Sequence, residues 1–316
     1  MKKTIIALAV ASATFGFSQT VFSDENYPER DIEFIVPYGP GGGSDNLVRA
    51  LQPKIEEALG GTLVVRNISG GGGAVGYNRA VSADLDGYTV TTPNNANFTL
   101  EGLGNVDFAY TDLEYIARVV VEPYVFASGN SLEWDDFDSM MEYIDEGGRV
   151  SVGFSGVGSS THVTSVAIGD ELGVNFQLVP YDGGSAAVSA AMGGHVDAVL
   201  LNPSDIMSAT QGGRLIPIFS TGETRASAYP DTPNLKEEGY DFVLDQWRGI
   251  AAPKGISQEV EDKWVEAVKE AVEDEDFRKF VEESGAEVQP LYGDELDEFV
   301  RRTAEVMIPI AQDVQE

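Results

Sequence analysis

The sequence predicts an α/β protein of two lobes, each a mainly parallel sheet flanked by helices. Segments rich in β-branched and apolar residues alternate with segments of helical apolar spacing along most of the chain, which is typical of parallel sheets covered by helices. A second observation is that one order of strand, glycine- or hydroxyl-rich loop and helix recurs, with loops at 38–45, 66–73, 155–161 and 181–185.

The chain is expected to cross between the lobes twice. The apolar run 115–126 is interrupted by Glu122 and Pro123, where we place the first crossing, and the strand 215–220 is taken as the return. A cleft between such lobes can close by a hinge motion. The predicted division is a discontinuous first lobe, 24–122 plus 223–316, and a continuous second lobe, 123–222.

The N-terminus has the pattern of a secretory signal peptide over residues 1–23. Lys2 and Lys3 precede an apolar stretch at 5–17, and small residues stand before Asp24. The apolar stretch is shorter than the roughly 20 residues that a membrane span needs. We therefore expect a cleaved signal and a periplasmic mature protein, and an uncleaved N-terminal anchor is the alternative.

Composition excludes several classes of function. The chain has 316 residues, enough for two domains with cores of their own. It has no cysteine, so disulfides, thiol nucleophiles and cysteine-ligated metals are excluded, and its two histidines do not suit a histidine-rich metal site. The net charge of −32 disfavours nucleic acid as a partner. No cofactor or metal is expected, and the acidic runs are interpreted as solvated faces.

The first lobe begins with two of the recurring units. Strand 32–37 leads through its loop into an amphipathic helix at 46–59, in which Pro53 predicts a kink or a restart. Strand 62–65 leads through the second loop into helix 74–83. A third strand, 88–92, ends in the polar segment 93–97, which should lie beside the glycine loops because ligands bind beyond the carboxyl ends of parallel strands.

The second lobe contains the other two units, and the chain then returns to complete the first lobe. In the second lobe we expect helices and strands in the order helix 134–145, strand 149–154, helix 162–172, strand 176–180, helix 186–192, strand 196–201, helix 205–211 and strand 215–220. In the returning part we expect strand 246–253, a helical region 257–284 that can break near 274–276, and helix 293–311.

The loops are the expected binding site for an anion. A loop at a helix N-terminus leaves backbone N–H groups unpaired, and the helix dipole favours negative charge there. Hydroxyl groups from the second lobe suit a carboxylate without neutralising it. The expected ligand contacts are Tyr38, Gly41, Gly42, Gly43, Ser44, Asp45, Gly72, Gly73, Ala74, Asn94, Asn97, Ser155, Ser159, Thr161, His162, Tyr181, Gly183 and Asn202.

Each of these residues also has a simpler structural role. The glycine loops can be plain turns, Ser44 and Ser160 can cap helices, and Asn202 can hold the turn at Pro203. Asp45 is either a capping or dipole-compensating residue at the helix start or a partner for an amino group on the ligand. His162 is more often a structural histidine than a ligand contact. Asn94 and Asn97 either form a turn or select the ligand, and Trp247 is assigned to the core or the cleft wall.

A series of motifs, in order along the mature chain, resembles the substrate-binding proteins of tripartite tricarboxylate transporters. The motifs are Pro-Gly-Gly-Gly-Ser-Asp at 40–45, the Asn and glycine-rich loop at 67–73, Asp-Gly-Tyr at 86–88, Gly-x-Gly-Ser-x-x-His at 156–162, Tyr-x-Gly-Gly at 181–184, Gly-Gly-x-Val-Asp at 193–197, Pro-Asp-Thr-Pro at 230–233 and Trp-Arg-Gly-Ile-Ala-Ala-Pro at 247–253. One such motif would be weak, whereas the ordered series is specific.

The resemblance implies the two-lobed Venus-flytrap fold of periplasmic binding proteins. It also implies a small di- or tricarboxylate, or a related organic acid, held by loops of both lobes and delivered to the large and small membrane subunits of a transporter. The protein is expected to be a monomer and not an enzyme. Two alternatives stay open, an exported α/β enzyme acting on a small carboxylate and a ligand-loaded partner of a membrane sensor kinase.

Enzyme motifs in the chain are weak. Residues 71–76 match the glycine pattern of a dinucleotide site, but a run of glycines makes such a match easy, and export argues against a dinucleotide. The sequence lacks a Gly-Lys-Ser/Thr phosphate loop, and residues 153–157 lack the last glycine of a nucleophile elbow. Neither histidine has an evident serine or aspartate partner in the sequence.

Overall fold

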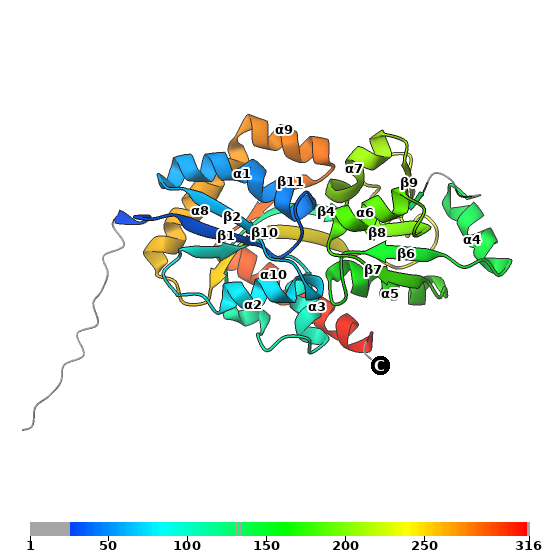
Figure 1. Cartoon of the computed structure of the whole chain (residues 1–316), viewed down its shortest axis with the longest axis horizontal. Helices are drawn as coiled ribbons and strands as arrows, with labels where there is room; N and C mark the ends of the chain where they lie inside the picture. The colour runs from blue at the N-terminus through cyan, green and yellow to red at the C-terminus, as the bar shows by residue number, and fades with distance from the viewer. Residues whose placement is uncertain (1–25, 130–131, 133, 315–316) are drawn as a thin grey trace, which may run out of the picture.

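The protein consists of two lobes that lie side by side, each built on its own sheet (Figure 1). This description rests on a computed structural model, which describes residues 26–129, 132 and 134–314. The signal peptide expected at 1–23 lies outside the described residues.

The first lobe holds a six-stranded sheet with the strand order β11-β4-β10-β3-β1-β2. β1 pairs in parallel with β2 and β3, whereas β10 pairs antiparallel with β3 and β4, and β11 pairs antiparallel with β4. The strand bounds are β1 Ile32–Val36, β2 Leu63–Asn67, β3 Thr89–Thr91, β4 Leu113–Pro123, β10 Asp245–Pro253 and β11 Glu287–Leu291.

The second lobe holds a five-stranded sheet with the strand order β7-β6-β8-β5-β9. β6 pairs in parallel with β7 and β8, and β5 pairs antiparallel with β8 and β9. The strand bounds are β5 Val125–Gly129, β6 Ser151–Phe154, β7 Gln177–Pro180, β8 Ala198–Leu201 and β9 Leu215–Ser220.

The predicted α/β class and two-lobed arrangement are confirmed, but the sheets are mixed rather than mainly parallel. The reason is the way in which the chain crosses between the lobes. β4 leaves the first lobe and β10 re-enters it, so the two strands run in opposite directions and pair with each other. β5 enters the second lobe and β9 ends it, and these two strands are antiparallel for the same reason.

The two connections between the lobes differ in length. Tyr124 alone separates β4 from β5, close to the expected first crossing, whereas residues 221–244 separate β9 from β10. We took strand 215–220 as the return and expected the first lobe to resume at residue 223. In the structure β9 belongs to the second sheet, and the side chains of Leu235, Tyr240 and Phe242 pack into the core of the second lobe. The chain therefore returns to the first sheet only at β10.

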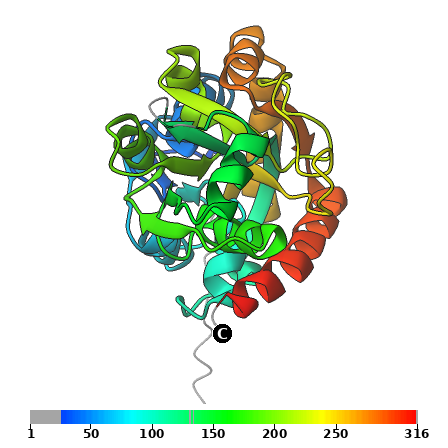
Figure 2. The ribbon, with the colours of Figure 1, turned by 90° about the vertical axis from the view of Figure 1, so that its right-hand side faces the viewer.

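Helices cover both faces of each sheet. In the first lobe, one face is covered by α1, α8 and α9 and the other by α2, α3 and α10 (Figure 1). Figure 2, which faces the second lobe, shows α10 running along one side of the molecule. The first-lobe bounds are α1 Gly43–Leu59, η2 Gly71–Gly73, α2 Ala74–Val81, α3 Ala96–Gly102, η3 Tyr110–Asp112, α8 Gln258–Glu273, α9 Glu275–Ser284 and α10 Gly293–Asp313.

In the second lobe, α4 and α5 pack on one apolar cluster, and α6 and α7 pack on another. Aromatic side chains dominate the first of these clusters, where the rings of Phe126 and Phe219 stack with their centroids 4.9 Å apart. Such burial of large aromatic surface is a main source of stability in a core. The helix bounds are α4 Phe137–Asp145, α5 Ser160–Leu172, α6 Gly184–Met192 and α7 Pro203–Gln211.

Candidate ligand-binding site between the lobes

The loops that follow the parallel strands meet at the seam between the lobes. Ser69 Oγ of the first lobe donates to Asp182 Oδ2 of the second lobe at 3.0 Å, and Thr99 Oγ1 donates to the carbonyl oxygen of Gly158 at 2.7 Å. The backbones approach closely at Gly72, where an added Cβ would lie 2.5 Å from the amide nitrogen of Ser159. The lobes are therefore in contact across their loops, and the site is in a closed arrangement.

A small hollow of about 30 Å³ lies at this seam. Both lobes contribute to its wall, the first lobe in part through strand β10, and polar side chains predominate in it. The lining residues are Tyr38, Gly42, Gly43, Ser44, Asn94, Ser155, Ser160, Thr161, Gly184, Asn202, Asp205, Gln246 and Arg248.

The structure brings part of the predicted site together around this hollow and places the rest elsewhere. Tyr38, Gly42, Gly43, Ser44, Asn94, Ser155, Thr161 and Asn202 line the hollow. A neighbouring, larger hollow of about 340 Å³ at the seam is lined by Gly72, Gly73, Tyr181 and Gly183, together with Tyr38 and Ser155. The wall of neither hollow includes Gly41, Asp45, Ala74, Asn97, Ser159 or His162.

Asp45 has structural partners in place of a ligand. Its carboxylate accepts hydrogen bonds from Gly41 N at 2.9 Å, from Asn67 Nδ2 at 3.0 Å and from Arg49 Nε at 3.0 Å. Although burial acts to raise the pKa of Asp45, the hydrogen bonds from Arg49, Gly41 and Asn67 hold that pKa below its ordinary value. Asp45 lies in the first turn of α1 and is not its N-cap, so the geometry favours a dipole-compensating structural role over a partner for an amino group.

His162, Ser159 and Asn97 are also held by the fold. The His162 ring stacks on Phe154 with centroids 4.8 Å apart, and burial lowers the pKa of this histidine. Ser159 Oγ accepts from the backbone N–H of His162 and caps α5. Asn97 Nδ2 donates to Tyr115 Oη at 2.8 Å, and Asn97 Oδ1 accepts from the backbone N–H of Asn94. These polar groups support the loops that form the site.

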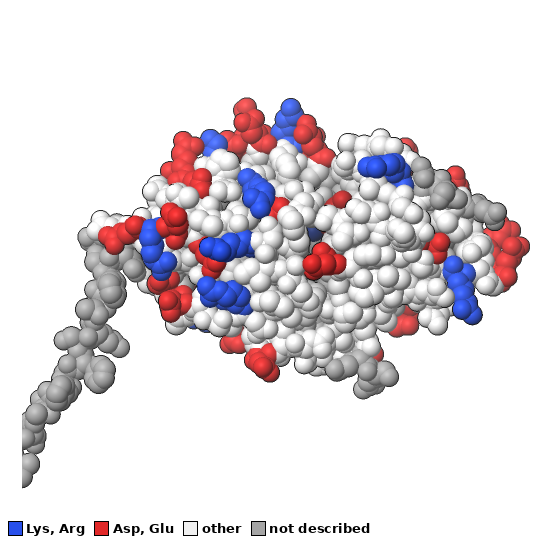
Figure 3. Space-filling view, viewed as in Figure 1, with Lys and Arg blue, Asp and Glu red and all other residues white. Residues whose placement is uncertain are grey.

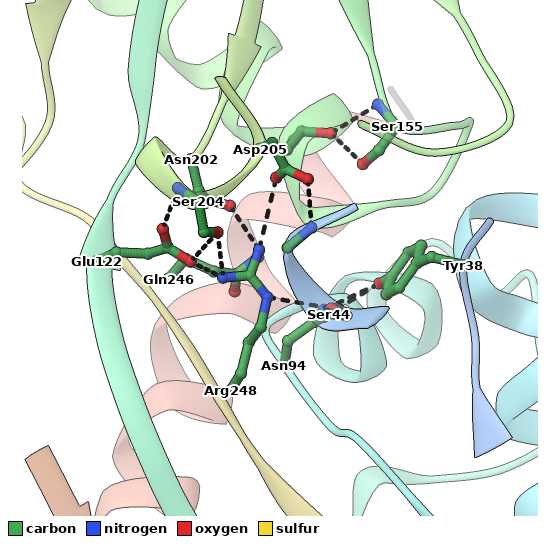
Figure 4. A network of polar contacts seen from close by, with 12 residues as sticks. Tyr38, Ser44, Asn94, Glu122, Ser155, Asn202, Ser204, Asp205, Gln246 and Arg248 are labelled. Carbon is green, nitrogen blue, oxygen red and sulfur yellow. Dashed lines mark hydrogen bonds and ion pairs between the residues drawn. The ribbon is translucent and has the colours of Figure 1, made fainter. Parts of the chain in front are cut away.

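Arg248 on β10 is the centre of the polar network in Figure 4. Its side chain is 5% exposed and forms an ion pair with Glu122 at the end of β4. The guanidinium donates from Nε to Ser44 Oγ at 3.1 Å, from Nη1 to Ser204 Oγ at 3.2 Å and from Nη2 to Asn202 Oδ1 at 3.3 Å. Arg248 therefore links the first helix of one lobe with the start of α7 in the other.

The charge of Arg248 already has a partner within the fold. The side chain of Glu122 is fully buried, and its carboxylate also accepts from the backbone N–H and the hydroxyl of Ser204. Burial lowers the pKa of Arg248 to about 10, while neighbouring Tyr38 and Tyr77 act to raise it. The arginine thus remains charged at neutral pH, and buried ion pairs of this kind need such additional hydrogen bonds to offset their lost hydration.

Asp205 brings a second carboxylate into the hollow. Its Oδ1 accepts from the backbone N–H of Gly43, across the seam, at 2.7 Å, and its Oδ2 lies 3.6 Å from Arg248 Nη2. It stands in the first turn of α7, where the helix dipole favours a negative charge. Burial raises the pKa of Asp205, although hydrogen bonds from the Gly43 and Asn202 backbones act against this.

The remaining polar groups of the hollow are neutral. Tyr38 Oη and the Asn94 amide lie 3.1–3.2 Å apart and can exchange hydrogen bonds. Ser155 and Thr161 hydroxyls lie 2.7 Å apart, and Gln246 Nε2 donates to Ser160 Oγ at 2.7 Å. Hydroxyl and amide groups of this kind can turn to suit a ligand's oxygen atoms.

The hollow contains donors and acceptors but no pairing of a hydroxyl with an imidazole among its wall residues. Within the described ranges, histidine, aspartate and glutamate side chains do not gather in a group of three or more that could hold a metal ion. In the same part of the chain, none of the helices is both long and apolar enough to span a membrane. The arrangement is suited to binding a small polar molecule.

Sequence reasoning missed five lining residues, Ser160, Gly184, Asp205, Gln246 and Arg248. A signal for two of them was available. Gln246 and Arg248 stand on either side of Trp247 in a predicted strand, and alternate residues of a strand share one face. Two polar side chains on one face of an otherwise apolar strand indicate a polar site. Asp205 had no such signal, because its contact with Gly43 joins distant parts of the sequence.

Two sheet-based lobes that close on a polar hollow define a periplasmic binding protein, a class that captures solutes between its lobes. The family model described as "Tripartite tricarboxylate transporter family receptor" matches residues 47–315, and the chain belongs to this family. The predicted family is thereby confirmed, and the family is a transporter receptor and not an enzyme.

Similar proteins agree with this assignment. BugT of Bordetella pertussis is 27% identical over 266 residues, which cover 82% of this chain and 81% of BugT. The structure of the periplasmic binding protein BugD aligns with a TM-score of 0.86 at 27% identity and covers 91% of this chain and 98% of BugD. MatC of Rhodopseudomonas palustris, a structure with bound malate, has the same fold, with a TM-score of 0.84 at 22% identity over 90% of this chain and 100% of MatC.

Proposed function

We propose that this protein binds a small organic carboxylate between its lobes and delivers it to the large and small membrane subunits of a tripartite transporter. In this proposal the protein works in the periplasm as a monomer, after the N-terminal signal has been cleaved. The observation that supports it best is the position of helix N-termini around the hollow.

Several helices begin at the wall of the hollow. Gly43 and Gly184 are the first residues of α1 and α6, Ser160 is the first residue of α5, and Asn202 is the N-cap of α7. The N-terminus of a helix carries a partial positive charge and unpaired N–H groups, both of which favour an anion. Asp205 and Glu122 already accept from the N–H groups of Gly43 and Ser204. A ligand's carboxylate would therefore use the remaining N–H groups together with the neutral hydroxyl and amide donors of the same wall.

The family name and the relatives support the same class of ligand. The family is described as the receptor of tricarboxylate transporters. The relative MatC has malate bound in its structure, so malate belongs among the compounds to be tested.

A thermal-shift screen of mature protein against organic acids tests the binding step. Compounds with one, two and three carboxylates are compared with a neutral sugar and with NAD. A ligand present at 100 times its Kd stabilises the folded state by about 2.7 kcal/mol, which gives a clear rise in Tm. Isothermal titration then measures Kd. The proposal fails if no carboxylate raises Tm while the sugar or NAD does.

The delivery step needs a separate experiment. Uptake of the identified acid is measured in proteoliposomes that contain the two membrane subunits, with and without the loaded binding protein. Uptake that depends on the binding protein supports delivery. Uptake that proceeds equally well without it contradicts delivery and leaves the binding step intact.

A further inference from the structure

The charged groups in and directly behind the wall of the hollow are more acidic than basic, because Glu122 lies behind the wall on Arg248 and Asp205 lines it. Arg248 is its only cationic lining residue among the described residues, and Glu122 already forms a buried ion pair with it. Asp205 adds a second carboxylate, 3.6 Å from the same guanidinium. One arginine therefore faces two carboxylates before any ligand enters.

We propose that Asp205 determines specificity by selecting a ligand that carries a protonated nitrogen beside its carboxylate, in preference to a plain di- or tricarboxylate. This inference rests on the proposed function, because it names the chemical class of the acid that the same hollow would bind.

The position of Asp205 is fixed by the fold. Its side chain is 9% exposed, and Oδ1 is held by the Gly43 N–H. Glycines surround the carboxylate: an added Cβ would lie 2.5 Å from Oδ1 at Gly184 and 3.3 Å from it at Gly42. A side chain at Gly184 would collide with Asp205, so the loops of both lobes leave space for this carboxylate. Figure 4 shows it directed toward the first loop and Arg248.

The charge balance explains the preference. A plain dicarboxylate would bring further negative charge into a buried site that already has one carboxylate in excess, and like charges repel strongly where water is excluded. A protonated amine beside Asp205 would supply the missing positive charge and a charge-assisted hydrogen bond. The ligand's carboxylate would remain on the helix N-termini and neutral hydroxyls described above.

Another way to relieve the repulsion is protonation of Asp205, which its burial favours. A protonated Asp205 could donate to the carboxylate of a plain acid. This alternative predicts tighter binding of plain dicarboxylates as the pH falls, with no advantage for amines. The two possibilities are therefore separated by pairs of ligands that differ in one amino group.

The experiment compares succinate with aspartate and glutarate with glutamate by isothermal titration of the full mature protein at neutral pH. Each pair differs by one amino group in place of hydrogen. We expect the amino acid of at least one pair to bind at least about tenfold more tightly than its plain partner, which corresponds to about 1.4 kcal/mol. Equal affinity within both pairs, or tighter binding of the plain acids, overturns the inference. This comparison uses only the protein without substitutions.

Asp205→Asn keeps the shape of the side chain and an acceptor for Gly43 N–H but removes the charge. We expect this variant to lose the preference for the amino acid. The matched control is Asp197→Asn, which removes one charge from the same lobe and also keeps an acceptor for a backbone N–H, that of Ser151, but lines neither hollow. We expect the control to keep the wild-type affinity ratio. A ratio that survives in Asp205→Asn, or disappears equally in both variants, contradicts the role of Asp205.

The outcome also distinguishes this inference from the proposed function. Binding of carboxylates without preference for an amino group contradicts the role of Asp205 and leaves the proposed function intact. Failure of every carboxylate, with or without an amino group, contradicts the proposed function, and the inference falls with it. A simple diamine, 1,4-diaminobutane, is included, and binding of this compound in place of any acid would contradict both.

Discussion

Replacement of Gly72 by alanine should prevent full closure of the lobes. Gly72 has φ of +66°, and an added Cβ would lie 2.5 Å from both the amide nitrogen of Ser159 and the carbonyl oxygen of Val157. Ordinary contact begins near 3.4 Å, so the facing backbones must separate by about 1 Å. Because both neighbours are backbone atoms on the opposite lobe, no side-chain rotation can relieve the overlap.

The size of the effect follows from the cost of overpacking. Forcing an extra methyl group into a filled space costs about 1–3 kcal/mol. Here the cost applies only to the closed form, since the open form separates the two loops. A ligand that binds the closed form should therefore lose about 5- to 150-fold in affinity. The upper end of this range is expected if the lobes cannot shift to relieve the overlap in the closed form.

The positive φ adds a separate cost that is present in both the open and closed forms. Gly60→Ala is the matched control, because Gly60 has φ of +68° and an added Cβ there would meet nothing within 4 Å. Both variants should lose about 1–2 kcal/mol of unfolding free energy from the left-handed conformation. Only Gly72→Ala should also lose ligand affinity, measured by titration. Equal affinities in the two variants would refute the reasoning.

Three further predictions concern charge. Glu122→Gln leaves Arg248 with Asp205, 3.6 Å away, as its remaining carboxylate partner and should cost up to about 3–5 kcal/mol in urea unfolding, and a double variant with Arg248→Met should recover part of that loss; an unchanged midpoint would show that Asp205 alone compensates the buried guanidinium. Ser44→Asp places a negative charge beside Asp205 at the N-terminus of α1 and should weaken carboxylate binding by at least about tenfold with little change in Tm, whereas Ser44→Asn should weaken it less; equal affinities would remove Ser44 from the site. Burial and the charges of Glu287 and Glu223 raise the pKa of Asp245 from 3.8 to about 6, so the folded state binds this proton more tightly than the unfolded state and stability falls as the pH rises from about 4 to about 6. Asp245→Asn should flatten that decline in a series of urea unfolding curves, and an identical decline in the variant would exclude Asp245 as its cause.

The elements of the fold that have strong local signals were predictable. The break between α8 and α9 was expected near 274–276, and Asp274 caps α9 there by accepting from the backbone N–H of Phe277. Pro53 was expected to kink or restart its helix, whereas α1 continues through it as one helix. β11 and α3 were not predicted, because β11 alternates exposed and half-buried residues and α3 follows a strand of only three residues.

The candidate site was predictable where it depends on loops and not where it depends on strands. Ser44, Asn94, Ser155 and Thr161 stand at or just after strand ends, and the rule for ligands at the carboxyl ends of strands finds them. Arg248 stands inside β10. Its importance follows from the antiparallel pairing of β10 with β4, which places Glu122 within reach. That pairing depends on how the chain crosses between lobes, which local sequence patterns do not specify.

The acidity of the whole chain and the affinity proposed for an anion are compatible because they act over different distances. Figure 3 shows acidic side chains spread over both lobes, with basic side chains among them on both. Exposed charges are screened within about 8–10 Å at physiological ionic strength. The N–H groups and helix N-termini around the hollow act at contact distance, where water is largely excluded and their effect is stronger. In the proposed mode of binding, the local charge balance among Glu122, Asp205 and Arg248, rather than the net charge of −32, therefore sets which acid is preferred.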